Sequence, residues 1–165
     1  MKSSLFSPLF IVLFIRCAFG QNIKDLKVDT TISGFHLAAN FQGTYIYTPN
    51  GSADVTPGKE PSAFSFTFMP SATIETAKKQ IEDYINMARH NGFDQNNIIS
   101  KDTLVNGNTI HWLSYTETKI GTPYKNIEFH GFYIKNGVAL LFISGDMDGG
   151  MYVELFKNTF FNSSF

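Results

Sequence analysis

The chain has 165 residues, of which 43% are hydrophobic and 16% are charged. This size and composition are typical of one folded domain with a single core, and they exclude a disordered chain. The sequence has no basic run longer than Lys78-Lys79, and Arg16 and Arg89 are its only arginines. Nucleic-acid binding needs a clustered basic face, so we expect no nucleic-acid partner.

Residues 1–20 have the pattern of a cleavable signal peptide. Lys2 supplies a positive charge, and the apolar stretch from Leu5 to Ile15 is shorter than the ~20 residues that span a bilayer. Ala18 and Gly20 place small residues where signal peptidases need them, which predicts cleavage before Gln21. We therefore expect a periplasmic or secreted protein that is not inserted in a membrane after cleavage.

The only cysteine, Cys17, lies inside this leader. The mature protein would therefore form no disulfide, no thiolate metal site and no cysteine nucleophile. Lipid attachment to Cys17 is an alternative, but bacterial lipoproteins carry a small residue before that cysteine and Arg16 stands there. An uncleaved anchor is the other alternative to a cleaved signal.

Residues 21–33 are predicted to form a tether or an edge segment, and residues 34–165 a single domain. Phe35–Phe41 and Thr44–Thr48 are β-prone and flank Gln42-Gly43, which predicts a hairpin. Ala63–Phe68 alternates phenylalanine with small side chains, a pattern typical of a half-buried strand.

A helix is predicted over Ile74–Asn91, where apolar residues recur at steps of three and four. Thr73 is a favourable N-cap, and Glu75 lies in the first turn, where a negative charge stabilises the helix. Gly92 can adopt the left-handed conformation that ends such helices, and Phe93 can fold back onto the last turn.

The rest of the chain predicts a four-stranded meander followed by a terminal helix. Asn106-Gly107 and Asn136-Gly137 are typical of tight hairpin turns. The expected elements are strands at Ile98–Val105, Thr109–Ile120, Asn126–Ile134 and Val138–Ile143, then a helix at Met151–Ser163. Successive antiparallel turns predict an α+β fold, in which helices flank a single antiparallel sheet as an α/β/α sandwich.

The order of these elements resembles the PsbP-like fold. That group includes a photosystem II subunit, a Ran-binding import factor and the periplasmic lipoprotein DcrB, and the resemblance extends over nearly all of the mature chain. It implies a binding or assembly protein rather than a catalyst. No short motif fixes an alignment, so no functional residue is carried over, and a shared fold does not supply a function.

Four histidines are the first candidates for chemistry: His36, His90, His111 and His130. His111 and His130 are predicted on the same side of neighbouring strands, but a loop near Gly121–Tyr124 would offset them by about 13 Å, too far to share a zinc ion. His90 at a helix end fits the helix dipole. We expect structural or solvated roles for all four.

The loop Gly145–Gly150 carries Asp146 and Asp148, which are weak candidates for a calcium site. An EF-hand loop needs an oxygen ligand at its fifth position and glycine at its sixth, where this loop has Gly150 and Met151. The alternative is that Asp148 caps the terminal helix. We favour the cap and expect no metal or other cofactor.

Aromatic residues on the predicted strands are candidates for a flat stacking platform that binds sugars or peptides. The alternative is that they pack in the core, because aromatic residues are favoured in strands. The candidate platform residues are Tyr45, Tyr47, Trp112, Tyr115 and Tyr133.

The sequence contains no nucleophile elbow, phosphate-binding loop or Rossmann fingerprint. We therefore expect an exported, non-catalytic accessory protein that binds a protein partner in the bacterial envelope. A small-ligand or glycan-binding module that uses the aromatic strand faces is the alternative.

Overall fold

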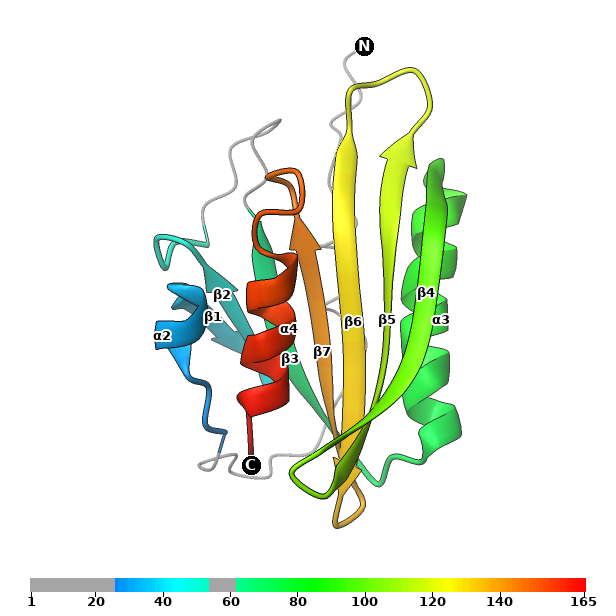
Figure 1. Ribbon diagram of the computed structural model, residues 1–165. Helices are drawn as coiled ribbons and strands as arrows, with labels where there is room; N and C mark the ends of the chain where they lie inside the picture. The colour runs from blue at the N-terminus through cyan, green and yellow to red at the C-terminus, as the bar shows by residue number, and fades with distance from the viewer. Residues whose placement is uncertain (1–25, 54–61) are drawn as a thin grey trace.

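The computed structural model describes residues 26–53 and 62–165, so the predicted signal peptide lies outside the described residues. Figure 1 shows one twisted sheet with helices on both sides. The elements in chain order are α2 (Thr30–Ser33), β1 (His36–Phe41), β2 (Thr44–Thr48), β3 (Ala63–Pro70), α3 (Ile74–His90), β4 (Phe93–Val105), β5 (Asn108–Lys119), β6 (Lys125–Lys135), β7 (Val138–Asp146) and α4 (Val153–Asn162).

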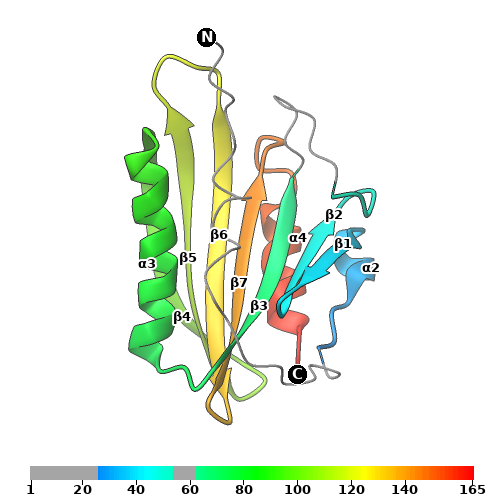
Figure 2. The same cartoon turned by 180° about the vertical axis from the view of Figure 1, so that it is seen from behind.

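The seven strands form one sheet in the order β1-β2-β3-β7-β6-β5-β4, and each neighbouring pair is antiparallel. Helix α4 and the short α2 lie on one face of the sheet, and α3 lies on the other, as the two opposite views show (Figures 1 and 2). The predicted α+β class and the antiparallel sheet with flanking helices are confirmed.

Tight turns set the strand pairing where the sequence predicts them. Asn106 and Asn136 have φ angles of 49° and 52°, and the glycines that follow them have 78° and 74°. Positive φ at both central positions is the requirement of a type I′ turn, which asparagine and glycine meet at low cost. Gln42 adopts the same conformation before Gly43, although glutamine is not favoured there.

Helix α3 begins with the predicted cap. The hydroxyl of Thr73 accepts a hydrogen bond from the backbone N–H of Thr76, and the Thr76 hydroxyl accepts one from the N–H of Thr73. This reciprocal pair is a capping box in which threonine replaces the usual Glu or Gln. The apolar stripe of the helix is buried, with Tyr84 and Ile85 at its centre.

The core has two parts, one on each face of the sheet. Phenylalanines dominate the part under α4, where Phe64, Phe66 and Phe68 of β3 are all buried, as their alternation predicts. Helix α3 covers the other part, which includes Tyr115 and Phe132. The sheet is therefore apolar on both faces in its centre, and Gly131 gives α4 room to approach β6.

Two segments differ in detail from the sequence prediction. Residues 26–33, part of the predicted tether or edge segment, contain the short helix α2, and Lys27 bridges to Ser164 near the end of the chain. Strand β4 begins at Phe93, five residues before the predicted start at Ile98, because Phe93 directly follows the turn that ends α3.

Within the part of the chain that the structure describes, no helix has the length and apolar character needed to cross a bilayer.

Candidate functional site

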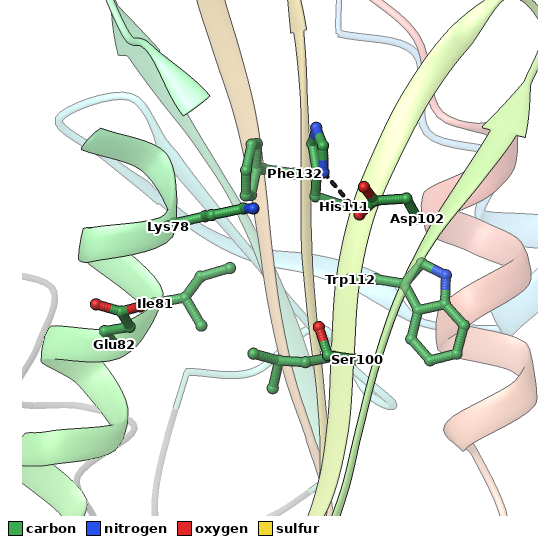
Figure 3. A pocket seen from close by; sticks show the side chains of 9 residues that line it. Lys78, Ile81, Glu82, Ser100, Asp102, His111, Trp112 and Phe132 are labelled. Atoms are coloured by element: carbon green, nitrogen blue, oxygen red, sulfur yellow. Dashed lines mark hydrogen bonds and ion pairs between the residues drawn. The ribbon is translucent and has the colours of Figure 1, made fainter. Parts of the chain in front are cut away.

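A groove of about 270 Å³ lies between α3 and the β4–β5 hairpin. Its floor is apolar, with Ile81 from the helix and Leu113 and Phe132 from the sheet. Its rim is polar, because α3 contributes Lys78 and Glu82 and the edge strand β4 contributes Ser100 and Asp102 (Figure 3). The remaining lining residues are His111 and Trp112, and the ring of Trp112 packs on the α4 side of the sheet.

His111 and Asp102 form the best-defined polar contact in the groove. The Nδ1 atom of His111 lies 2.7 Å from Oδ1 of Asp102. An ionised carboxylate only accepts hydrogen bonds, so Nδ1 carries the proton and donates it. The imidazole also stacks on Phe132, with a centroid distance of 4.9 Å and an interplanar angle of 26°. The ring is thus fixed on two sides, and Nε2 is the nitrogen that remains for a ligand.

The rim carries charges of both signs. Lys78 and Glu82 lie one turn apart on α3, and Figure 3 shows the Lys78 side chain extending from the helix toward Phe132 and His111. The Asp102 side chain is 62% exposed, whereas the His111 side chain is only 14% exposed. A ligand in this groove would therefore meet an apolar floor and exposed charges above it, the arrangement found in protein–protein interfaces.

A second polar cluster lies under the C-terminal half of α3 and is closed to solvent. Glu117, Asn126, Glu128 and His130 are each at most 5% exposed. The Tyr124 hydroxyl donates to Glu117 at 3.0 Å. The Asn126 amide lies 3.3 Å from the Tyr124 oxygen and donates to Glu128 at 2.5 Å. These bonds join two strands and a loop into one buried network.

His130 extends the network toward α3. Its Nε2 atom lies 3.0 Å from the Tyr115 hydroxyl and 3.4 Å from Oε2 of Glu128, and its ring meets the edge of Tyr84 at 5.1 Å. Burial raises the pKa of Glu128 well above its usual range, and the nearby Glu117 raises it further. Burial also lowers the pKa of His130 to about 3. The contact therefore joins two neutral groups and is not an ion pair.

Close packing leaves this cluster little freedom. A Cβ atom at Gly145 on β7 would lie 2.8 Å from Nδ2 of Asn126 and 3.2 Å from Oε1 of Glu128, so the cluster rests directly on the β7 backbone. Burial also raises the pKa values of Tyr84, Tyr115 and Tyr124, which keeps their phenol groups protonated. The cluster is a buried hydrogen-bonded element of the core.

The prediction for the histidines is correct in part. His111 and His130 do face the same side of neighbouring strands, but the 13 Å offset is wrong. His111 pairs with Phe132 and Leu113 pairs with His130, so the offset is two residues, or about 7 Å. The register differs because Thr118 already pairs with Lys125 across the loop. His90 is exposed and its Nδ1 lies 2.7 Å from the Asn86 carbonyl oxygen.

Asp146, not Asp148, caps the terminal helix. Asp146 is fully buried and accepts hydrogen bonds from the backbone N–H groups of Tyr152 and Val153, at 2.5 and 3.1 Å, and from that of Asp148. Asp148 instead accepts from the Ser62 hydroxyl at 2.6 Å. The cap assignment to Asp148 was wrong because β7 runs on to Asp146, which brings that carboxylate beneath the start of α4.

Among the described residues, no group of three or more His, Cys, Asp or Glu side chains can hold a metal ion. The carboxylate oxygens of Asp146 face three backbone N–H groups, which favour an anion at this position. We therefore assign Asp146 to the helix cap and Asp148 to the contact with Ser62.

The aromatic residues do not form a flat exposed platform. Tyr47, Tyr115 and Tyr133 are at most 7% exposed. Tyr115 packs in the cluster under α3, whereas Trp112 packs on the opposite face beside α4. Tyr45 is half-buried against Phe68. The platform prediction was wrong because helices cover both faces of the sheet, so the alternation that brings these rings together places them in the core.

Glu117, Asn126 and Glu128 are functional candidates that the sequence does not single out. Asn126 and Glu128 occupy alternate positions on β6, as on a solvent-facing strand, but α3 covers this face of the sheet. In the structure Glu117 lies opposite Asn126, and Glu128 lies opposite Tyr115. This register differs from the predicted one, so the sequence does not bring the three side chains together.

No protein-family model and no curated protein sequence matches this chain. Solved structures with a similar fold include cyanobacterial PsbP (CyanoP) from Synechocystis sp. PCC 6803, which is 14% identical with a TM-score of 0.48 and covers 91% of this chain and 98% of its own. PA94 from Pseudomonas aeruginosa, a protein of unknown function, is 12% identical with a TM-score of 0.47 and coverages of 76% and 84%.

The Ran-binding protein Mog1p from Saccharomyces cerevisiae is also similar in fold. It is 6% identical, with a TM-score of 0.42, and the match covers 76% of this chain and 74% of Mog1p. CyanoP is a PsbP protein and Mog1p is a Ran-binding protein, and the order of elements resembles the group that includes such proteins.

Proposed function

We propose that this protein is an exported, non-catalytic accessory protein that binds another protein of the bacterial envelope. The leader at residues 1–20 supports export. The observation that supports protein binding is the groove between α3 and the β4–β5 hairpin, which has an apolar floor and a charged rim. Protein interfaces typically combine an apolar centre with a polar, solvent-accessible rim.

Exposed aliphatic side chains lie along β4, one on each face. Ile99 and Leu104 are 49% and 74% exposed. Leu104 lies on the same face as Asp102, which borders the groove, and Ile99 lies on the same face as Lys101. Single exposed aliphatic residues are ordinary on a protein surface, but here they lie on an open strand at the rim of a groove, where a partner could cover them. A partner that covers β4 and the groove would remove these side chains from water, which stabilises the complex.

The geometry favours a protein over a small ligand. The groove of about 270 Å³ is at the lower limit of pockets that enclose drug-sized molecules, which hold roughly 300–1,000 Å³. It is also open along the exposed strand β4, so a small molecule would keep much of its surface in water. An extended surface of this kind fits a macromolecular partner that contacts the rim as well as the floor.

Site-specific photocrosslinking in the cells that naturally produce the protein tests this function. A photoreactive amino acid replaces Glu82 on the groove rim in one variant and Glu154 on α4 in a matched control. We expect one discrete protein adduct from position 82 and none from position 154. The absence of any adduct at position 82, or the same adducts at both positions, would contradict the proposed binding surface.

A further inference from the structure

The second half of β4 is a regular, open strand edge. Within residues 26–53 and 62–165, β4 pairs with β5 alone, and it is the last strand of the sheet. Its pairing is irregular only between Asn96 and Ile99, so Ile99–Val105 continues without a bulge. Edge strands are usually short, bulged or shielded because their unpaired backbone groups can accept another strand. Seven regular residues are enough for a further strand to pair.

The register with β5 decides which side chains of this edge face the groove. Ser100 and Asp102 lie opposite Leu113 and His111, and all four of these side chains border the groove under α3. Lys101 lies opposite Trp112 and faces the α4 side. Directly opposite residues in antiparallel strands share a face. A residue of an added strand that lies opposite Asp102 therefore shares the face of the groove and lies beside its rim.

We propose that the partner contributes an extended segment that pairs antiparallel with β4, an inference that rests on the protein-binding function proposed above. The segment places a basic residue opposite Asp102 and an acidic residue opposite Lys101. Apolar residues lie opposite Leu104 and Ile99, which are the exposed aliphatic ends of the edge. Backbone hydrogen bonds supply affinity in this mode of recognition, and alternate side chains supply specificity.

A second copy of the chain does not fit this edge through its own β4. Two β4 strands related by a two-fold axis keep each residue on its own face, so odd-numbered residues lie opposite odd-numbered residues only. Lys101 therefore never lies opposite Asp102 of the other copy. When the two-fold axis passes through residue 101 or residue 102, Lys101 lies opposite Lys101 of the other copy or Asp102 lies opposite Asp102. Like charges that lie directly opposite each other are destabilising. This restriction favours a different chain as the partner.

The other edge of the sheet does not complement β4 either. Strand β1 (His36–Phe41) contains no Lys, Arg, Asp or Glu side chain to meet Lys101 and Asp102. Pairing of β1 with β4 would also join copies head to tail, which gives rings or open chains rather than a two-fold dimer. The charges on β4 therefore select a partner segment that carries an adjacent basic and acidic residue.

Two capped peptides test this pairing on the full chain. The first has the central sequence Val-Thr-Lys-Glu-Thr-Val, which places Lys opposite Asp102 and Glu opposite Lys101 in the antiparallel register. The second has the two charged residues exchanged. We expect the first peptide to bind roughly three- to tenfold more tightly, because two cross-strand pairs change from repulsive to attractive. Amide chemical-shift titration locates the contact on β4.

A third peptide keeps the side chains of the first but carries N-methyl groups on the alternate residues whose N–H groups would face β4, which removes the backbone donors along that edge. Strand addition predicts that this peptide loses binding, whereas docking by side chains alone predicts that it does not. A protein with both Lys101→Asp and Asp102→Lys should reverse the preference between the first two peptides. The wild-type comparison alone remains decisive if this variant does not fold.

Equal binding of the first two peptides to the wild-type protein, or undiminished binding of the N-methylated peptide, would overturn the strand pairing. Neither result would affect the crosslinking outcome at position 82. If position 82 gives a specific protein adduct but the first two peptides bind equally well, the proposed function is retained and pairing with β4 is rejected. Loss of the adduct would reject the function itself.

Discussion

Gly131 of β6 lies directly beneath the ring of Phe160 on α4. A Cβ atom at position 131 would lie 2.5 Å from Cε1 of Phe160 and 3.2 Å from the carbonyl oxygen of His111. Phe160 is fully buried and stacks on Phe142 with a centroid distance of 5.0 Å. Phe142 packs against the Phe160 ring, so the ring cannot easily move away from β6. The position of α4 on the sheet therefore depends on the absence of a side chain at Gly131.

The substitution Gly131→Ala should therefore destabilise the protein, although its backbone conformation suits alanine. We expect a loss of about 1–3 kcal/mol in the free energy of unfolding, which is typical of overpacked cores. Urea denaturation measures it. Adding Phe160→Leu should cost less in the Gly131→Ala protein than in the wild type, because the smaller side chain relieves the clash. Additive losses would show that the two residues do not oppose each other.

Removal of the buried cap should separate the roles of the two loop acids. Asp146→Ala leaves the N–H groups of Tyr152, Val153 and Asp148 without their acceptor, and we expect a loss of roughly 2–3 kcal/mol. Asp148→Ala is the control, because this exposed residue only accepts from Ser62, and it should cost less than about 1 kcal/mol. The opposite order, measured by urea denaturation, would refute the cap assignment.

Local rules account for what the sequence predicts correctly. Asn106-Gly107 and Asn136-Gly137 need positive φ angles at adjacent positions, and few other residue pairs tolerate them. The helix α3 is set by its cap at Thr73 and by its apolar stripe. These features depend on neighbours in sequence, so a single sequence is sufficient to locate them.

Features that depend on tertiary position are not accessible in the same way. Asn126, Glu128 and His130 alternate with Ile127 and Phe129 along β6, a pattern that indicates a polar face in water. Helix α3 covers that face and provides Tyr84 as a neighbour of His130. The burial of these polar residues follows from where the helix packs, which the strand pattern does not contain.

The buried acid in this network should make stability depend on pH. The pKa of Glu128 is raised from 4.5 in the folded state, so its contribution to stability is present at low pH and lost as pH rises. The pKa of His130 is lowered from 6.5 to about 3, so its contribution is present above 6.5 and lost as pH falls. The two effects oppose each other between pH 4.5 and 6.5, and Glu128 dominates above that range.

We therefore expect Glu128→Gln to be more stable than the wild type at pH 7–8 and to lose this advantage below pH 4.5. The difference should grow by at most about 1.4 kcal/mol per pH unit until the folded-state pKa is reached. Urea denaturation across this pH range measures it. Glu154→Gln on the exposed surface of α4 is the control and should show no such trend. A wild type that is more stable than Glu128→Gln above pH 7 would contradict the assignment of a neutral Glu128.

The groove gives a prediction that does not depend on the identity of the partner. Asp102 holds the proton of His111 on Nδ1 because its carboxylate lies 2.7 Å from that nitrogen. Replacing Asp102 by alanine removes this acceptor, and the neutral imidazole can then carry its proton on either nitrogen. The cost in stability should stay below about 1 kcal/mol, because the Asp102 side chain is largely exposed.

Nitrogen-15 chemical shifts of the imidazole report this change directly. At a pH where the ring is neutral, the wild-type protein should show a protonated Nδ1 and an unprotonated Nε2. In Asp102→Ala the two shifts should move toward each other, while Glu82→Ala, a change on the same rim without a bond to His111, should leave them unchanged. If the Asp102→Ala spectrum matched the wild type, Asp102 would not be the group that sets the tautomer of His111, and the role assigned to their contact would be rejected.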